Sequence, residues 1–306
     1  MVDKERICFI RPKIDNNDYY FNAIVKMGFR IYVPYIGNWL IFRVIREIWF
    51  RMRLPFVSLW YNKRIKEEKA DIFILRDSLL TNDFINWIRY FHPDARIIMD
   101  YDNLANTTIR PDQIQDQHVE KWSYDVNDCK KYGMKLKPHS FLDVYRIKDK
   151  REPKIDILYL GRDKGRLQSL LELEKKMKEL GLRTYFHICA DRRFLRVTNH
   201  KYKKLLSYYE YMDLMKESRA ILNIVGSDQA SMTMRDMEVV FNGIKGITNN
   251  KLALEFPLYD KSRFFVLGID PIESLPFFLD SPFKQISDEE LIPFCYENSI
   301  EYMITH

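Results

Sequence analysis

The sequence predicts an α/β protein of two domains, each built on its own parallel sheet. Short apolar runs rich in β-branched and aromatic residues alternate with longer helical patterns, and a charged stretch divides these runs into two groups. Strands that alternate with helices at this spacing form βαβ units, whose strands lie parallel. At 306 residues, 46% of them hydrophobic, the chain is long enough for two domains with their own cores.

The first group predicts strands at Ile7–Ile10, Arg30–Val33, Asp71–Leu75 and Arg96–Met99. The second group predicts strands at Ile155–Leu160, Thr184–Cys189, Ala220–Val225, Gly246–Thr248 and Phe264–Leu267. Residues 142–154 between them are charged and carry Pro153 just before the next strand, which is typical of a linker. We therefore expect two Rossmann-like domains facing a cleft, residues 1–150 and 151–306. One doubly wound sheet of nine strands is the alternative.

Composition and charge limit the class of protein. The net charge of +6 is compatible with nucleic acid, anionic lipid or phosphorylated small molecules as partners. The scattered cysteines have no spacing typical of a disulfide framework or a zinc site, which indicates a reducing compartment; they are Cys8, Cys129, Cys189 and Cys295. The first apolar run ends at Arg11, too early for a signal peptide or a spanning helix, so we expect a cytoplasmic protein.

The segment 39–66 combines seven Arg and Lys residues and three tryptophans with a single acid, Glu47. A helix over residues 38–53 has a basic side and an apolar side, and Pro55 then ends or kinks it. This pattern is typical of a helix that lies in the headgroup plane of an anionic membrane. A helix packed on the sheet is one alternative, and a nucleic-acid surface is another, although no RNP, KH or zinc-finger motif is present. We expect no nucleic-acid partner and assign the membrane-facing role to Trp39, Arg43, Arg46, Trp49 and Arg53.

A glycine-containing loop follows the strand at 155–160. It reads Gly161-Arg162-Asp163-Lys164-Gly165-Arg166 and precedes a helix that ends at Gly181. The glycines let the backbone approach an anion, and three cations and a helix N-terminus favour a diphosphate there. The spacing is neither a Walker motif nor a G-x-G-x-x-G fingerprint, and a tight turn with solvated charges is the alternative.

A second candidate feature is a predicted helix from Thr233 to Phe241. It presents Arg235 and Glu238 on one face, and Asn249 follows the next strand, where open α/β sheets bind ligands. We expect Glu238 to hold ribose hydroxyls while Thr233, Arg235 and the helix N-terminus hold phosphates. A surface Arg–Glu pair is the alternative.

Two stretches carry a recognisable pattern. The run from Ile155 to Asn250 contains DILYLGRDKGR and then S-x-T-x-R-x-x-E-x-x-x-x-G-x-K-x-I-T-N-N, and residues 122–133 read WSYDVNDCKKYG. Both resemble GT-B glycosyltransferases of lipopolysaccharide or capsule synthesis. The resemblance implies a nucleotide-diphosphate sugar bound by the C-terminal half, with Glu238 as the ribose-binding acid, and a saccharide or lipid-linked acceptor at the N-terminal half. Ala230 stands where retaining E-x7-E enzymes have their first acid, so the stereochemical outcome stays open.

Glycosyl transfer needs a positioned acceptor hydroxyl and, in an inverting enzyme, a base. The loops after the first and fourth strands offer four carboxylates at strand ends, Asp15, Asp18, Asp100 and Asp102. We predict Asp18 or Asp102 as the base, with turn and cap residues as the alternative.

Asp100-Tyr101-Asp102 also spells the D-x-D by which GT-A enzymes bind a divalent metal. Because the nucleotide-binding features lie after residue 155, we expect neither a metal nor another cofactor. A metal-dependent GT-A transferase using Asp100 and Asp102, and a non-catalytic membrane-surface nucleotide-binding protein, remain alternatives.

Overall fold

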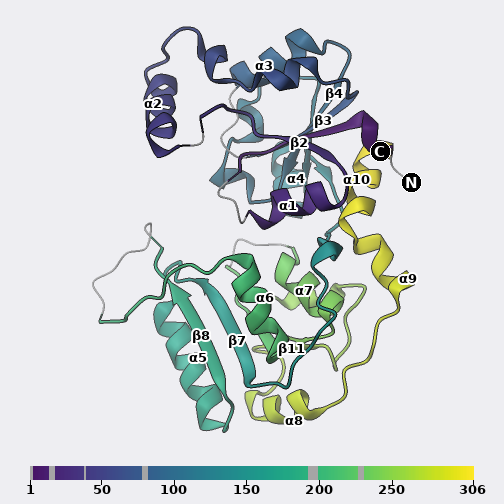
Figure 1. Cartoon of the computed structure of the whole chain (residues 1–306). Helices are drawn as coiled ribbons and strands as arrows, with labels where there is room; N and C mark the ends of the chain where they lie inside the picture. Colours follow the sequence, from purple (N-terminus) through teal and green to yellow (C-terminus); the bar gives the residue numbers. More distant parts are fainter. Residues whose placement is uncertain (1–2, 14–17, 38, 78–81, 192–198, 227–230) are drawn as a thin grey trace. The chain divides into compact units, whose positions relative to one another are not determined.

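The computed structural model describes residues 3–13, 18–37, 39–77, 82–191, 199–226 and 231–306. Two compact units divide the chain: Met1–Pro138 with Ser299–His306, and His139–Asn298. Each unit has its own all-parallel sheet with helices against it (Figure 1). The chain is therefore an α/β protein of two Rossmann-like units, as the sequence predicts.

The sheet of the first unit has six strands in the order β2-β1-β3-β4-β5-β6. They are β1 (Ile7–Ile10), β2 (Arg30–Tyr32), β3 (Ile72–Arg76), β4 (Arg96–Tyr101), β5 (Val119–Ser123) and β6 (Lys135–Leu136). The sequence does not predict β5 and β6. Two charged residues, Glu120 and Lys121, interrupt the apolar pattern of β5, and β6 is only two residues long.

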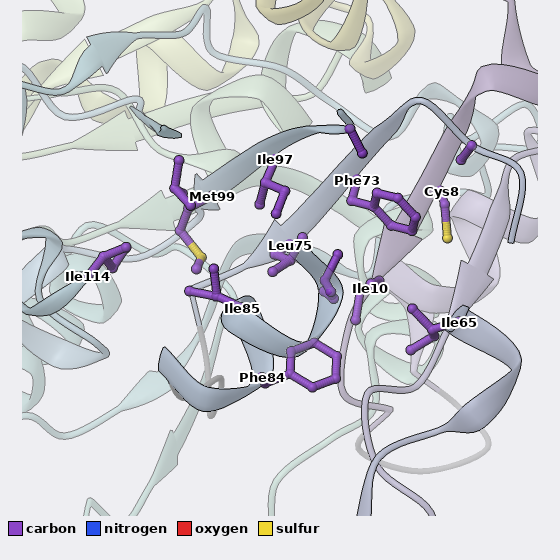
Figure 2. Close-up of a cluster of buried hydrophobic side chains, with 14 of the residues drawn as sticks. Cys8, Ile10, Ile65, Phe73, Leu75, Phe84, Ile85, Ile97, Met99 and Ile114 are labelled. Atoms are coloured by element: carbon purple, nitrogen blue, oxygen red, sulfur yellow. The ribbon is translucent and has the colours of Figure 1, made fainter. Parts of the chain in front are cut away.

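One face of this sheet packs on α3 (Asn82–Phe91), and Figure 2 shows the side chains that meet there. Alternate residues of each strand point to this face, because successive side chains of a strand lie on opposite sides. Each fully buried aliphatic or aromatic side chain contributes about 1.5–3 kcal/mol. The buried residues include Cys8, Ile10, Phe73, Leu75, Phe84, Ile85, Ile97 and Met99. Helices α1 (Tyr19–Lys26) and α4 (Val126–Tyr132) complete the regular connections of this sheet.

The sheet of the second unit has five strands in the order β11-β10-β9-β7-β8. They are β7 (Ile155–Arg162), β8 (Thr184–Cys189), β9 (Ser218–Asn223), β10 (Lys245–Thr248) and β11 (Phe264–Val266). Helices α5 (Leu167–Glu179) and α8 (Leu275–Asp280) pack on one face, and α6 (Tyr208–Lys216) packs on the other. Helix α7 (Met234–Asn242) connects β9 to β10, and α9 (Asp288–Leu291) follows α8.

The division between the units falls after Pro138, whereas the sequence places it near residue 150. The charged stretch contains residues that belong to the second unit: Ile147 lies in a core with Tyr211, and its amide donates to Asn242 Oδ1 at 2.7 Å. At the other end, helix α10 (Tyr296–Thr305) passes into the first unit, where Arg96 Nη2 donates to the carbonyl of Met303 at 2.8 Å.

Both sheets reverse their strand order at their first strand. β1 lies between β2 and β3, and β7 lies between β8 and β9. Ligands of open α/β sheets bind outside the carboxyl ends of the strands at such a reversal. The topology therefore points to one candidate site on each unit.

Helix α2 (Leu40–Arg51) stands apart from the strands of its unit in Figure 1, joined to them by loops. Among the described residues, no helix has the length and apolar character needed to cross a bilayer.

Candidate functional site

The loop between β7 and α5 lies at the strand-order reversal of the second unit. Strand β7 continues through Gly161 and Arg162 before the loop turns. A Cβ at Gly161 would lie 2.7 Å from Tyr159 Oη, so a larger residue there would require the Tyr159 side chain to shift. Lys164 and Gly165 have φ angles of 48° and 79°, a left-handed turn that glycine adopts without steric cost. Arg162 and Lys164 are exposed at this edge.

The start of α5 is occupied by a carboxylate of the chain itself. Asp163 Oδ1 accepts from the amide of Leu167 at 2.8 Å, and Oδ2 accepts from Tyr202 Oη at 2.7 Å. The amide of Leu167, at the helix N-terminus predicted to bind a phosphate, therefore already donates a hydrogen bond to Asp163. Arg166 donates to the carbonyl of Ile224 and so joins the loops that follow β7 and β9. Arg162 and Lys164 are the cations of this loop whose side chains are exposed.

Glu238 forms a buried network with Arg235 and Tyr211. Arg235 Nη1 donates to Tyr211 Oη at 2.7 Å, and Tyr211 Oη donates to Glu238 Oε2 at 2.9 Å. Burial raises the pKa of Glu238, and Arg235 partly offsets that effect. Glu238 Oε1 completes no hydrogen bond among the described residues, although the Tyr208 hydroxyl is close enough to oppose the rise in the pKa of Glu238. A buried polar oxygen without a complete partner is costly, and because Glu238 is 0% exposed, a ligand hydroxyl can satisfy it once a covering side chain has moved aside.

Thr233 and Asn249 have backbone partners of their own. Thr233 caps α7: its hydroxyl oxygen accepts from the amide of Arg235 at 3.1 Å. Asn249 clamps Val225, accepting from its amide at 2.8 Å and donating to its carbonyl at 3.1 Å. Both residues position loops at the carboxyl edge.

Sequence reasoning missed a basic segment beside this edge. Lys203 is paired with Cys189, the last residue of β8, in an isolated bridge, and Lys201, Lys203 and Lys204 are exposed. The available signal was three lysines within residues 200–204, in the stretch between the predicted strands Thr184–Cys189 and Ala220–Val225. Tyr211 had no comparable signal, because its position next to Glu238 depends on how α6 packs against α7.

On the first unit, Asp102 lies in a cluster of charged side chains at the carboxyl ends of β1, β3 and β4. Its carboxylate accepts from Lys137 Nζ at 3.1 Å and Arg11 Nη1 at 3.3 Å, and lies 3.8 Å from Arg76 Nη1. Tyr20 Oη donates to it at 3.5 Å. These cations outweigh burial and lower the pKa of Asp102.

The neighbouring carboxyls have opposite shifts. Burial, reinforced by the charge of Asp102, raises the pKa of Asp77 to about 7, although Thr108 Oγ1 donates to it at 3.1 Å. Burial raises the pKa of Asp100 to about 6, with Lys137 opposing the shift. The sequence analysis did not select Asp77. It follows β3 directly, so the rule that ligands bind at the carboxyl ends of strands would have identified it as a candidate site residue.

The remaining predicted acids differ in their surroundings. Asp18 caps α1, where Oδ1 accepts from the amide of Phe21 at 3.0 Å. Lys137 donates to both Asp100 and Asp102, so an ammonium group bridges the D-x-D pair. Asp15 and Ala230 lie outside the described residues.

Helix α2 turns an apolar face to the solvent. Trp39 is 78% exposed and Ile41 70%, and the exposed apolar residues at helical spacing are Leu40, Ile41, Val44, Ile45, Ile48 and Met52. Arg46, assigned from sequence to the membrane-facing side, is only 7% exposed: it stacks on Tyr35 and donates to the carbonyl of Ile36 at 3.3 Å. That assignment of Arg46 is therefore wrong.

The other residues of this segment that were assigned from sequence to the membrane-facing side differ in their exposure. Trp49 is half-buried against Trp60 and donates to the carbonyl of Pro55 at 2.9 Å. Arg43 and Arg53 are exposed, as is Arg51, which was not assigned from the sequence.

No protein-family model matches the chain, and a comparison with curated proteins finds no match. Among solved structures, the chain is similar to a DNA-modifying β-glucosyltransferase studied with and without its substrate uridine diphosphoglucose. The TM-score is 0.53 and the identity 11%, over 98% of this chain and 95% of that chain. The apo form of lipopolysaccharide outer core galactosyltransferase WaaB aligns with TM-score 0.49 and 13% identity, over 97% of this chain and 99% of that chain. The likeness to the β-glucosyltransferase identifies the fold as GT-B.

Proposed function

We propose that the chain is a glycosyltransferase that moves a sugar from a nucleotide-diphosphate sugar to a lipid-linked saccharide in surface polysaccharide synthesis. The observation that carries this proposal is the buried carboxylate of Glu238 beside Arg235, in a Rossmann-like unit whose strand order reverses at β7. One oxygen of this carboxylate completes no hydrogen bond among the described residues. The GT-B fold supports it, as does the sequence resemblance around Glu238.

The donor nucleotide belongs, in this proposal, to the carboxyl edge of the second unit. Glu238 Oε1 accepts a ribose hydroxyl, while Arg162, Lys164 and Arg235 neutralise the diphosphate. A charge-assisted contact of this kind contributes about 1.5–3 kcal/mol. Thr233, Arg166 and Asn249 hold the surrounding loops, and their hydrogen bonds to the backbone support that positioning role.

The acceptor hydroxyl loses its proton, in this proposal, to Asp102. Geometry is the first criterion for a base, and Asp102 has the most accessible carboxyl of its cluster, 16% exposed against 5% for Asp100 and 0% for Asp77. Its lowered pKa keeps it ionised at neutral pH, although the same cations reduce its strength as a base. Asp18 is the weaker candidate because its carboxylate caps α1.

No metal or other cofactor takes part in the proposed reaction. The ammonium group of Lys137 neutralises Asp100 and Asp102, the pair that a metal-dependent enzyme of the alternative class would use. This contact favours the metal-independent class.

The acceptor is proposed to reside at the anionic cytoplasmic face of a cell membrane. The exposed apolar face of α2 supports this location, because its side chains gain free energy on leaving water. The flanking cations Arg43, Arg51 and Arg53 each add about 1 kcal/mol near an anionic leaflet. All four cysteines are free, as a reducing compartment requires.

The test is binding of UDP-, GDP-, dTDP- and CMP-sugars, measured by calorimetry on the wild type and on Glu238→Gln. Glutamine keeps an acceptor for Tyr211 but loses the charge, so we expect the affinity for the best donor to fall roughly ten- to a hundredfold. Glu179→Gln, at an exposed site of the same unit, is the control and should bind as the wild type does. Wild-type affinity in Glu238→Gln, or no donor binding by the wild type, contradicts the proposal.

A further inference from the structure

A groove of about 430 Å³ lies at the carboxyl end of β2, the edge strand of the first unit. Its walls are mainly aromatic and aliphatic, with Phe21 from α1, Ile31 and Val33 from the β2 region, and Tyr35 and Ile36 from the chain before α2. Arg64 stands at the same groove. None of these residues was singled out for a small ligand by the sequence.

The polar groups of the groove wall are already engaged. Asn62 donates to the carbonyl of Val33 at 3.0 Å and accepts from the amide of Arg64 at 3.2 Å. Tyr32 directs its hydroxyl to Glu68, a bond that, with burial, raises the pKa of Tyr32. The wall is therefore suited to a hydrocarbon chain, which needs no hydrogen-bond partners.

Arg64 lines this groove and Lys13 lies beside one of its wall residues, and neither cation is in an ion pair with a carboxylate of the described residues. Arg64 is exposed, and Lys13 Nζ lies 5.0 Å from the ring centre of Phe21, which lines the groove. A hydrocarbon wall with two such cations complements a molecule with an apolar chain and an anionic end. A lipid phosphate has both parts.

We propose that this groove binds the first segment of a phosphorylated lipid chain, with the phosphate at Arg64 and Lys13. This inference rests on the proposed function, since it names the lipid-phosphate part of the acceptor. Continuity with its surroundings supports it: Phe21 lines the groove and the adjacent Tyr20 donates to Asp102, so one helix, α1, borders both the groove and the carboxylate proposed as the base. The groove also includes Gly37, just before α2.

The experiment uses soluble alkyl phosphates and the full chain, with calorimetry as the readout. Affinity should rise from butyl to hexyl to octyl phosphate, by up to about fourfold per buried methylene, because each contributes about 0.8 kcal/mol. Arg64→Glu should weaken octyl phosphate binding about tenfold or more. Lys63→Glu reverses a neighbouring exposed cation outside the groove and should change nothing.

Three further arms separate the sources of binding. Octanol and inorganic phosphate should each bind much more weakly than octyl phosphate, because each offers only half of the recognised chemistry. Ile41→Asp, on the exposed face of α2, should leave octyl phosphate binding unchanged. Affinity independent of chain length, or wild-type affinity in Arg64→Glu, overturns the proposal.

Donor binding is measured separately, so the two proposals fail separately. A chain that binds octyl phosphate as described but no nucleotide sugar keeps the groove assignment and loses the glycosyltransferase assignment. The reverse result keeps the enzyme and removes its lipid-phosphate site.

Discussion

Asp77 should make the first unit less stable as the pH rises from about 4 to about 7. Its carboxyl is fully buried beside Asp102, and burial together with that charge raises its pKa to about 7 from an ordinary value of 3.8, although Arg76 Nε lies 3.5 Å from its Oδ1 and opposes the shift. The folded chain therefore keeps a proton on Asp77 at pH values where the unfolded chain has already released it. The perturbation that isolates this effect is Asp77→Asn, which cannot ionise and keeps an oxygen for Thr108.

The size of the effect follows from the difference between the two pKa values. A shift of about 3 units, at about 1.4 kcal/mol per unit, corresponds to about 4 kcal/mol. Because the folded-state pKa is the higher one, this contribution to the free energy of unfolding is fully present below about pH 4. It is lost as the pH rises through about 7, after which Asp77 remains ionised in both states.

Urea unfolding followed by tryptophan fluorescence reports on the first unit of the chain. All five tryptophans belong to that unit, at residues 39, 49, 60, 87 and 122. The free energy of unfolding of the wild type minus that of Asp77→Asn should fall by about 4 kcal/mol between pH 4 and pH 8. Asp94→Asn, at an exposed site of the same unit, is the control. A difference that stays constant or rises with pH refutes the reasoning.

Two further predictions concern the proposed acceptor unit. Asp102→Asn should lower kcat by ~10²–10⁴ without changing donor affinity. Asp18→Asn should keep most activity, because asparagine caps helices about as well as aspartate. Equal activity of the two variants contradicts the assignment of Asp102 as the base. In liposome flotation, the double variant Ile41→Asp with Ile45→Asp should not bind vesicles even at low salt. The double variant Arg43→Glu with Arg51→Glu should bind more weakly, mainly to anionic vesicles. Wild-type flotation by both double variants shows that α2 is not the membrane contact.

The sequence located most strands because buried parallel strands are apolar throughout, and it failed where that condition fails. Glu120 and Lys121 lie in the middle of β5, so apolar content alone does not reveal this strand. The same limit explains the boundary between the units. Charged neighbours hide Leu142, Tyr145 and Ile147, which are buried in the second unit.

The candidate sites were predictable where a strand end alone places a residue. Asp102 and the Gly161–Arg166 loop follow from the rule that ligands bind at the carboxyl ends of strands. The partners that determine their chemistry come from distant elements: Tyr211 from α6 shares a hydrogen bond with Glu238, and Lys137 follows the two-residue β6. Their placement depends on packing between elements, which the spacing of residues in the sequence does not contain.

Helix α2 shows that periodicity identifies the faces of a helix without saying which one packs inward. An apolar face normally covers the core, yet Arg46 is the buried residue here because the ring of Tyr35 and the carbonyl of Ile36 compensate its guanidinium. Trp49 and Phe50, three and four residues later, lie on the same side, and Phe50 contacts Tyr35. This anchoring leaves Ile41, Ile45 and Ile48 43–70% exposed, so each forgoes part of the about 1.5–3 kcal/mol that complete burial contributes. In the proposed membrane contact, insertion of that face would recover part of this free energy, so apolar contact, with the cations at its edge, is the main expected source of membrane affinity.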